Sequence, residues 1–113
     1  MIKIYHNNRC RKSREGLALL EESNREFEVI HYLEHPPTPK ELREILSKLA
    51  MSPEQLIRKN EAIWKDQFKG KDLSDDQLVE AMSAHPKLIE RPIVINNNTA
   101  VIGRPPSVIL DIL

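Results

Sequence analysis

The chain has 113 residues, of which 40% are hydrophobic and 30% charged, and its formal net charge is zero. That length supports one domain with a modest core, and that balance argues against disorder. A neutral chain gives no electrostatic reason to bind nucleic acid or an anionic membrane, and no apolar run reaches the roughly 18 residues of a membrane span. We therefore expect a single domain over residues 1–113 with no nucleic-acid or membrane partner.

The first third of the chain alternates between strand and helix patterns. Residues 2–5 and 27–32 are rich in β-branched and aromatic side chains and predict two strands. Residues 13–23, with Leu17 and Leu20 on one face, predict a helix between them. A strand, a helix and a strand in about 30 residues indicate a βαβ unit with parallel strands and a right-handed crossover.

The middle of the chain carries repeated helix-start signals. Thr38, Ser52 and Ser74 each stand three residues before a Glu or Gln, the spacing of a capping box. We therefore predict three helices that begin at these caps. Residues 59–73 are charged and irregular, and we expect a loop there with about one helical turn.

The last part returns to strands. Residues 91–95 and 99–102 predict the third and fourth strands, joined by a turn at residues 96–98 because Asn tolerates positive φ. A final helix is expected to open at Pro105-Pro106. The predicted fold class is α/β: a four-stranded mixed sheet with a helical insertion between its βαβ and ββα halves.

Cys10, the only cysteine, follows the first strand and directly precedes the first helix. The unsatisfied N–H groups and the dipole of a helix N-terminus stabilise an anion there. Basic residues crowd the same stretch, and both effects favour the reactive thiolate and a lowered Cys10 pKa. The competing interpretation is a small buried apolar residue, as most free cysteines are. The polar, basic neighbours disfavour it; they are Arg9, Arg11, Lys12 and Arg14.

A single cysteine also limits the redox chemistry. It excludes a secreted disulfide scaffold, and the strand-like start lacks the apolar region of a signal peptide, so we expect a cytoplasmic protein. Ser13 occupies the position of the second cysteine of a dithiol motif. A disulfide at Cys10 must therefore be completed by a thiol from another molecule.

Three arginines stand at predicted element boundaries: Arg58, Arg91 and Arg104. Their planar guanidinium groups suit an oxyanion better than ammonium groups do. Most single arginines are solvated surface charges, however, and sequence position alone does not raise these three above that expectation.

Histidine and proline positions leave alternatives open. His6, four residues before Cys10, could tune the thiol or relay a proton, or could simply end a strand. His31 and His35 have the spacing of helical metal ligands but lie at a strand end, so we expect no metal site. Arg91-Pro92 fits either a proline at the start of a strand or a cis peptide.

Five segments, in order along nearly the whole chain, resemble the glutaredoxin-linked arsenate reductases of bacteria. They are His6-Asn7-x-x-Cys10-x-x-Ser13-Arg14, Ile30-His31-Tyr32-Leu33-Glu34-x-Pro36-Pro37, Leu56-Ile57-Arg58-Lys59-Asn60, Arg91-Pro92-Ile93-Val94 and Ile109-Leu110-Asp111-Ile112-Leu113. The resemblance implies a thioredoxin-like fold with a helical insertion. It departs locally at Asn8-Arg9, where the best-known members have a proline and a small residue.

The resemblance also implies roles. Cys10 would be the nucleophile, and the oxyanion-binding arginines would be Arg58, Arg91 and Arg104. Pro92 would be a cis-proline, with His6, Ser13 and Arg14 as supporting residues near the thiol. No cofactor would stay bound: glutathione would be the co-substrate, glutaredoxin the protein partner, and arsenate or another oxyanion the substrate.

Two other functions remain open. The first is a thiol-disulfide or glutathione-linked oxidoreductase of the same fold that does not use arsenate. The second is a regulator like the Spx-type proteins, which bind RNA polymerase and typically carry a Cys-x-x-Cys switch. Ser13 in place of the second cysteine, together with all three arginines, disfavours the regulator.

Overall fold

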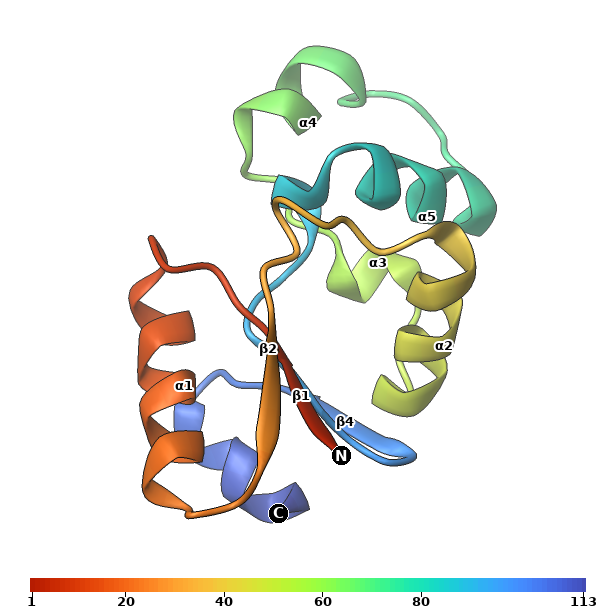
Figure 1. Ribbon diagram of the computed structural model, residues 1–113. Helices are drawn as coiled ribbons and strands as arrows, with labels where there is room; N and C mark the ends of the chain where they lie inside the picture. The colour runs from red at the N-terminus through yellow and green to blue at the C-terminus, as the bar shows by residue number, and fades with distance from the viewer. The chain divides into compact units, whose positions relative to one another are not determined.

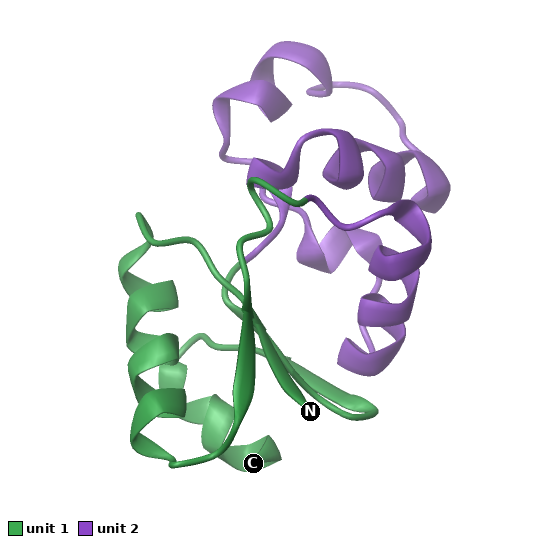
Figure 2. Ribbon diagram, viewed as in Figure 1, with its two compact units in different colours: residues 1–35, 91–113 green, residues 36–90 purple.

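The computed structural model describes all of residues 1–113, which divide into two compact units (Figure 2). Residues 1–35 and 91–113 form the first unit, and residues 36–90 form the second. The second unit is helical and has no strand of the sheet, so it is the insertion that the sequence predicts between the two halves of the sheet.

The first unit is built on a four-stranded mixed sheet (Figure 1). Its strands are β1 (Ile2–Tyr5), β2 (Phe27–Ile30), β3 (Ile93–Asn96) and β4 (Thr99–Ile102), in the order β2-β1-β3-β4. β1 pairs parallel with β2 and antiparallel with β3, and β3 pairs antiparallel with β4. The mixed sheet of the predicted α/β class is therefore confirmed.

One face of the sheet is covered by α1 (Arg11–Glu22) and η2 (Pro106–Ile112), which pack against each other (Figure 1). Successive side chains along a strand point to opposite faces of the sheet, so one apolar set points into this layer and excludes water. One core cluster of the unit consists of the buried residues Ile2, Ile4, Leu20, Val94 and Ile109.

The second unit consists of α2 (Pro39–Leu49), α3 (Pro53–Leu56), α4 (Ala62–Gln67), α5 (Asp75–Ala84) and the 3₁₀ turn η1 (Pro86–Leu88). The predicted caps at Thr38 and Ser74 are present, and at Ser52 the Gln55 side chain accepts from the Ser52 N–H at 3.0 Å. Thr38 Oγ1 accepts from the Glu41 N–H at 3.1 Å while Glu41 Oε1 accepts from the Thr38 N–H at 3.0 Å. Ser74 and Gln77 make the same reciprocal pair at 3.2 and 2.8 Å.

Some element ends differ from the prediction. α1 begins at Arg11, not at residue 13, because Cys10 itself is the extended N-cap residue. β2 ends at Ile30, not at residue 32, because the His31 carbonyl accepts from two later N–H groups and turns the chain. β3 starts at Ile93, since Pro92 has no N–H to give to a ladder.

The middle and the end of the chain give two further outcomes. Residues 59–73 contain the six-residue helix α4, which is longer than the single turn expected there. Trp64 of this helix is buried and stacks on Phe68, and this apolar contact stabilises the segment. The predicted C-terminal helix is present and has the 3₁₀ form.

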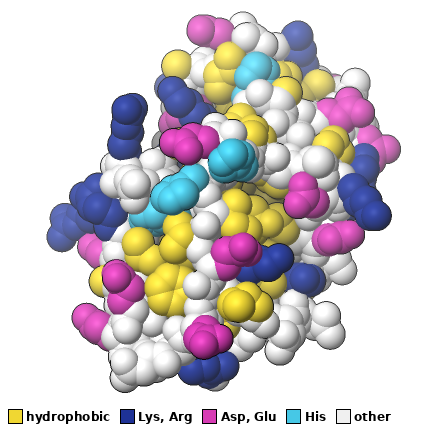
Figure 3. All heavy atoms as spheres, viewed as in Figure 1, with side chains coloured by type: hydrophobic (Ala, Val, Ile, Leu, Met, Phe, Trp, Pro, Cys, Tyr) yellow, Lys and Arg dark blue, Asp and Glu magenta, His cyan; other side chains and the backbone are white.

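None of the helices is long and apolar enough to cross a membrane. Acidic and basic side chains are interspersed on the face seen in Figure 3, with no broad area of one sign.

Candidate active site

Cys10 lies at the junction between β1 and α1. Its backbone is extended, its carbonyl accepts from the Arg14 N–H at 3.0 Å as the first bond of α1, and its own N–H donates to the Asn7 carbonyl at 3.0 Å. Cys10 is 7% exposed. The thiol is thus at a helix N-terminus, as the sequence predicts, in a turn that fixes its position.

The pKa of Cys10 is set by opposing effects. Burial raises the pKa of the thiol, but hydrogen bonding from the Ser13 backbone, the Arg91 side chain and the Lys12 backbone lowers it, and the net pKa is below the ordinary cysteine value. Helix N-terminal amides and a guanidinium thus stabilise the thiolate together. The direction is the one that the sequence predicts.

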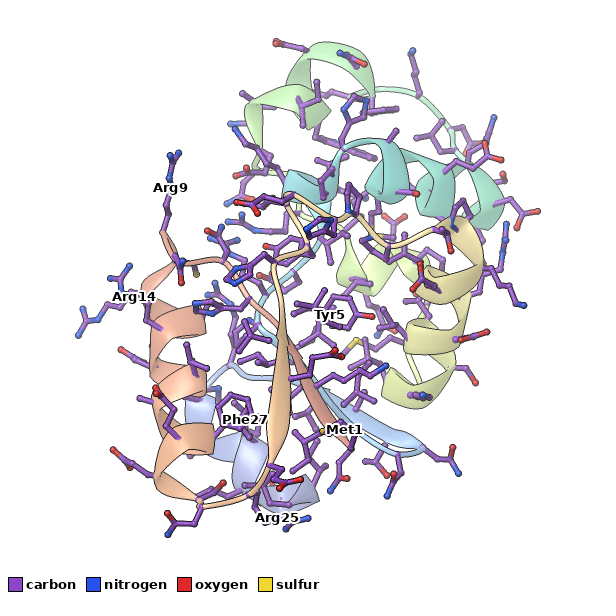
Figure 4. The ribbon with its side chains drawn as sticks, in the orientation of Figure 1. Met1, Tyr5, Arg9, Arg14, Arg25 and Phe27 are labelled. Atoms are coloured by element: carbon purple, nitrogen blue, oxygen red, sulfur yellow. The ribbon has the colours of Figure 1, made fainter.

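The local basic side chains contribute less than the sequence suggested. Arg11 pairs with Glu15 at 3.1 Å, and Arg14 donates to the Asn8 carbonyl at 2.9 Å. Figure 4 shows Arg9 and Arg14 extending outward from the loop and from α1. The guanidinium groups that act on the sulfur come from distant parts of the sequence.

Arg91 and Arg104 are both brought to Cys10 within the first unit. The Nη2 atom of Arg104 is 3.6 Å from Cys10 Sγ, and its Nε donates to the Arg91 carbonyl at 2.8 Å. The Nε and Nη1 atoms of Arg91 are buried. The peptide bonds Arg91-Pro92 and Arg104-Pro105 are both cis. The first answers the question that the sequence left open, and the second was not anticipated.

His6 is 1% exposed and joins Ser13 and Asn8 in a buried network. Its Nε2 lies 2.5 Å from Asn8 Oδ1, and its Nδ1 lies 2.6 Å from Ser13 Oγ. Because an amide oxygen only accepts, Nε2 carries the proton and Nδ1 accepts from the Ser13 hydroxyl. Ser13 Oγ in turn accepts from the Asn7 N–H at 2.9 Å.

This network ties the loop before Cys10 to the first turn of α1. Burial is the main cause that lowers the pKa of His6, the Asn8 hydrogen bond opposes it, and His31, 6.1 Å away between ring centroids, lowers it further. A neutral His6 bonded to Ser13 fits a residue that holds the Cys10 turn in place better than one that carries a proton to the sulfur.

Arg58 belongs to the second unit, where it follows α3. Its side chain is 16% exposed and makes ion pairs with Glu61 at 3.3 Å and Glu90 at 3.6 Å. Neither glutamate was singled out in the sequence. Glu61, three residues after Arg58, has the spacing of a local ion pair, but nothing in the pattern indicates the contact with Glu90.

A cavity of about 330 Å³ opens beside the loop that precedes Cys10. It lies within the first unit and is lined by His6, Asn7, Asn8, Arg9, His31, Leu33 and Glu34. Both signs of charge and an apolar side chain border it, so it could hold a zwitterionic molecule of modest size. The chain contains no group of three or more His, Cys, Asp or Glu side chains placed to hold a metal ion.

Comparison with known proteins gives consistent matches over the whole chain. The model of the ArsC family matches residues 5–112. The uncharacterized protein YfgD of Escherichia coli strain K12 is 47% identical over 99% of this chain and 96% of its own length. An arsenate reductase of Neisseria meningitidis is 43% identical over 92% of this chain and 91% of its own.

The solved structure of an arsenate reductase from Vibrio cholerae superimposes with a TM-score of 0.95. It is 46% identical and covers 99% of this chain and 97% of that one.

Proposed function

Since the chain is a member of the ArsC family, we propose that it is an arsenate reductase in which thiolate Cys10 attacks arsenate, with glutathione and glutaredoxin as the electron source. The observation that carries the proposal is the pairing of a helix-capping thiol of lowered pKa with two guanidinium groups, those of Arg91 and Arg104. The nucleophilic sulfur and two groups suited to binding an oxyanion thus lie close together.

The first step is nucleophilic. The Cys10 sulfur gives an electron pair to As(V), an As–O bond breaks, and the departing oxygen takes up protons and leaves as water. The product is a covalent Cys10–S–As(V) adduct. No electrons have yet been transferred to the arsenic.

The arginines stabilise this step. As the As–O bonds rearrange, negative charge on the oxygens is offset by preorganised guanidinium donors. Arg91 and Arg104 act beside the sulfur, and the Arg104 bond to the Arg91 carbonyl keeps the two in a fixed relation. Arg58 is assigned to the same anion because it matches an oxyanion-binding arginine of the family.

The electrons must come from outside the chain, which has one cysteine. A glutathione thiolate attacks the Cys10 sulfur; an S–S bond forms, the S–As bond breaks, and arsenic leaves with the electron pair as As(III) in arsenite. Glutaredoxin then attacks the glutathione sulfur and releases thiolate Cys10. The cavity beside residues 6–9 gives glutathione room to approach.

The decisive experiment measures arsenite formed from arsenate with glutathione and glutaredoxin, for the wild type, Cys10→Ser and Arg58→Ala in parallel. We expect steady turnover by the wild type, none by Cys10→Ser, and a loss on the order of 10² in Arg58→Ala, typical for one oxyanion donor. No arsenite above background from the folded wild type would refute the proposal.

A glutathione-linked oxidoreductase that does not use arsenate is the second candidate. The cavity beside the loop that precedes Cys10 favours it, because an activated cysteine that follows such a cavity-lining loop could also serve glutathionylated substrates. Release of glutathione from a glutathionylated peptide, without arsenite formation, would select this function instead.

A further inference from the structure

Arg58 is held between two carboxylates inside the second unit. Its Nη1 lies 3.3 Å from Glu61 Oε2 and its Nε lies 3.6 Å from Glu90 Oε1. All three side chains are mostly buried, at 16%, 28% and 29% exposure. Such pairs are screened less by solvent than ordinary surface pairs, so they influence whatever else approaches the guanidinium.

The backbone fixes this arrangement. Residues 56–58 and 88–90 run antiparallel: the Arg58 N–H donates to the Leu88 carbonyl at 2.7 Å, and the Glu90 N–H donates to the Leu56 carbonyl at 3.0 Å. Glu61 is the N-cap residue of α4. Each carboxylate thus comes from a segment with a defined backbone, which makes the cluster a built feature rather than a chance surface contact.

The charges conflict with simple anion binding. Two carboxylates lie beside the one guanidinium, so an oxyanion bound to Arg58 would meet two like charges nearby. If tight binding of any anion were the purpose, an unpaired arginine would serve better. The carboxylates therefore need a different explanation at a site that takes oxyanions.

The two carboxylates can be explained by the protons that some oxyanions carry. An ionised carboxylate can only accept hydrogen bonds. At neutral pH arsenate and phosphate keep at least one proton and can donate an O–H to it, whereas sulfate keeps none. Neither ion pair uses the Nη2 atom of Arg58, so an anion bonded there would meet the carboxylates beside it. A protonated oxyanion would gain a hydrogen bond, and sulfate would meet repulsion alone.

We propose that Glu61 and Glu90 are specificity-determining residues, which admit protonated tetrahedral oxyanions to Arg58 and reject fully ionised ones such as sulfate. This rests on the proposed function for the role of Arg58 in holding the oxyanion. The two glutamates act on the choice of ligand and take no part in the chemistry at sulfur.

The test measures how inorganic arsenate, phosphate and sulfate, each alone, protect Cys10 from iodoacetamide at pH 7. The readout needs no turnover. In the wild type we expect half-protection by arsenate and phosphate at lower concentrations than by sulfate. In Glu61→Gln and Glu90→Gln, the sulfate concentration for half-protection should fall about tenfold relative to that of arsenate, a difference of about 1.4 kcal/mol.

Glu54→Gln is the matched control, because Glu54 forms an ion pair with Lys59, the neighbour of Arg58. Its selectivity should equal that of the wild type. An unchanged ratio of sulfate to arsenate in both glutamate variants would overturn the proposal, as would a Glu54→Gln shift of the same size.

Two further outcomes separate this proposal from the proposed function. If arsenate and sulfate protect Cys10 of Arg58→Ala at the same concentrations as in the wild type, Arg58 does not hold the anion. The inference then fails, whatever substrate the protein reduces. If the glutamate variants shift the ratio but the wild type forms no arsenite, the selectivity stands and the assignment as an arsenate reductase fails.

Discussion

The Cys10 thiolate is stabilised from two sources, the backbone amides at the start of α1 and the side chain of Arg91. The strand-to-helix junction correctly placed the thiol at a helix N-terminus, since the N-cap position follows from local patterns alone. The cation that stabilises the thiolate could not be predicted in this way. Arg11, close in sequence, pairs with Glu15, whereas Arg91 is brought to the thiol by the folding of the sheet. The contribution of the backbone amides to the Cys10 pKa can thus be predicted from local sequence, but the contribution of the guanidinium charge depends on tertiary structure.

The lowered pKa of Cys10 can be tested by chemical labelling. The rate of iodoacetamide labelling against pH should give a midpoint below the free-cysteine value of about 8.5, because the thiolate is favoured. In Arg91→Ala the midpoint should rise, since a hydrogen bond and a positive charge are lost. Arg11→Ala, whose side chain pairs with Glu15, is the control and should keep the wild-type midpoint.

The sign for stability follows from the same shift. A cysteine with a lowered folded-state pKa binds fewer protons than the unfolded chain, so it contributes stability above the unfolded pKa and loses that contribution as pH falls through the folded one. A labelling midpoint at or above 8.5 in the wild type would contradict the stabilised thiolate.

At the scale of elements, the starts of the capped helices were predictable, and the exact ends of other elements were not. The caps at Thr38 and Ser74 work through bonds between residues three apart, which a sequence displays directly. The start of α1 at Arg11 and the early end of β2 were missed, because the turn bonds around Cys10 and His31 decide them. Arg91 and Arg104 flank the hairpin of β3 and β4, so their meeting depends on a sheet pairing that periodicity does not reveal.

Close packing behind that hairpin gives a second prediction. A Cβ added at Gly103 would lie 2.9 Å from Pro92 Cγ and 3.0 Å from Ile109 Cδ1. Since a proline ring cannot rotate away, Gly103→Ala should destabilise the fold by about 1–3 kcal/mol. Urea unfolding followed by circular dichroism measures this cost.

The same substitution should also disturb the site, because Pro92 directly follows Arg91. We expect slower Cys10 labelling in Gly103→Ala at neutral pH. Gly70→Ala is an informative contrast: it has open space around it but a φ of +83°, so any cost there comes from the backbone and should leave Cys10 labelling unchanged. Wild-type stability of Gly103→Ala would mean that the neighbouring side chains move aside at little cost.

The whole molecule has one thiol and one sheet, and a helical unit of residues 36–90 separates the two chain segments that form the sheet. The sequence predicted this order because each element carries its own signals, and the family resemblance linked it to a thioredoxin-like fold. The joint role of Arg58 with the first-unit arginines came from that resemblance alone, since no local pattern connects residues on different units.

A one-thiol protein should depend fully on an added thiol. We expect reduced protein mixed with arsenate to form no arsenite, and addition of glutathione without glutaredoxin to yield arsenite up to about one equivalent while Cys10 gains one glutathione. Mass spectrometry of the intact chain, with Cys10→Ser as the control, follows the adduct. Arsenite formed from protein and arsenate alone would show a different electron source.

Ser13 shows why the chain would not readily gain a resolving cysteine. Its side chain is fully buried, and its hydroxyl holds the His6 ring and the Asn7 amide together beneath the thiol. A sulfur atom there would be a poor replacement in both bonds and would start out hidden from solvent. The position that completes a dithiol pair in other proteins is here a structural brace, so a self-sufficient redox cycle would first require rebuilding the turn that activates Cys10.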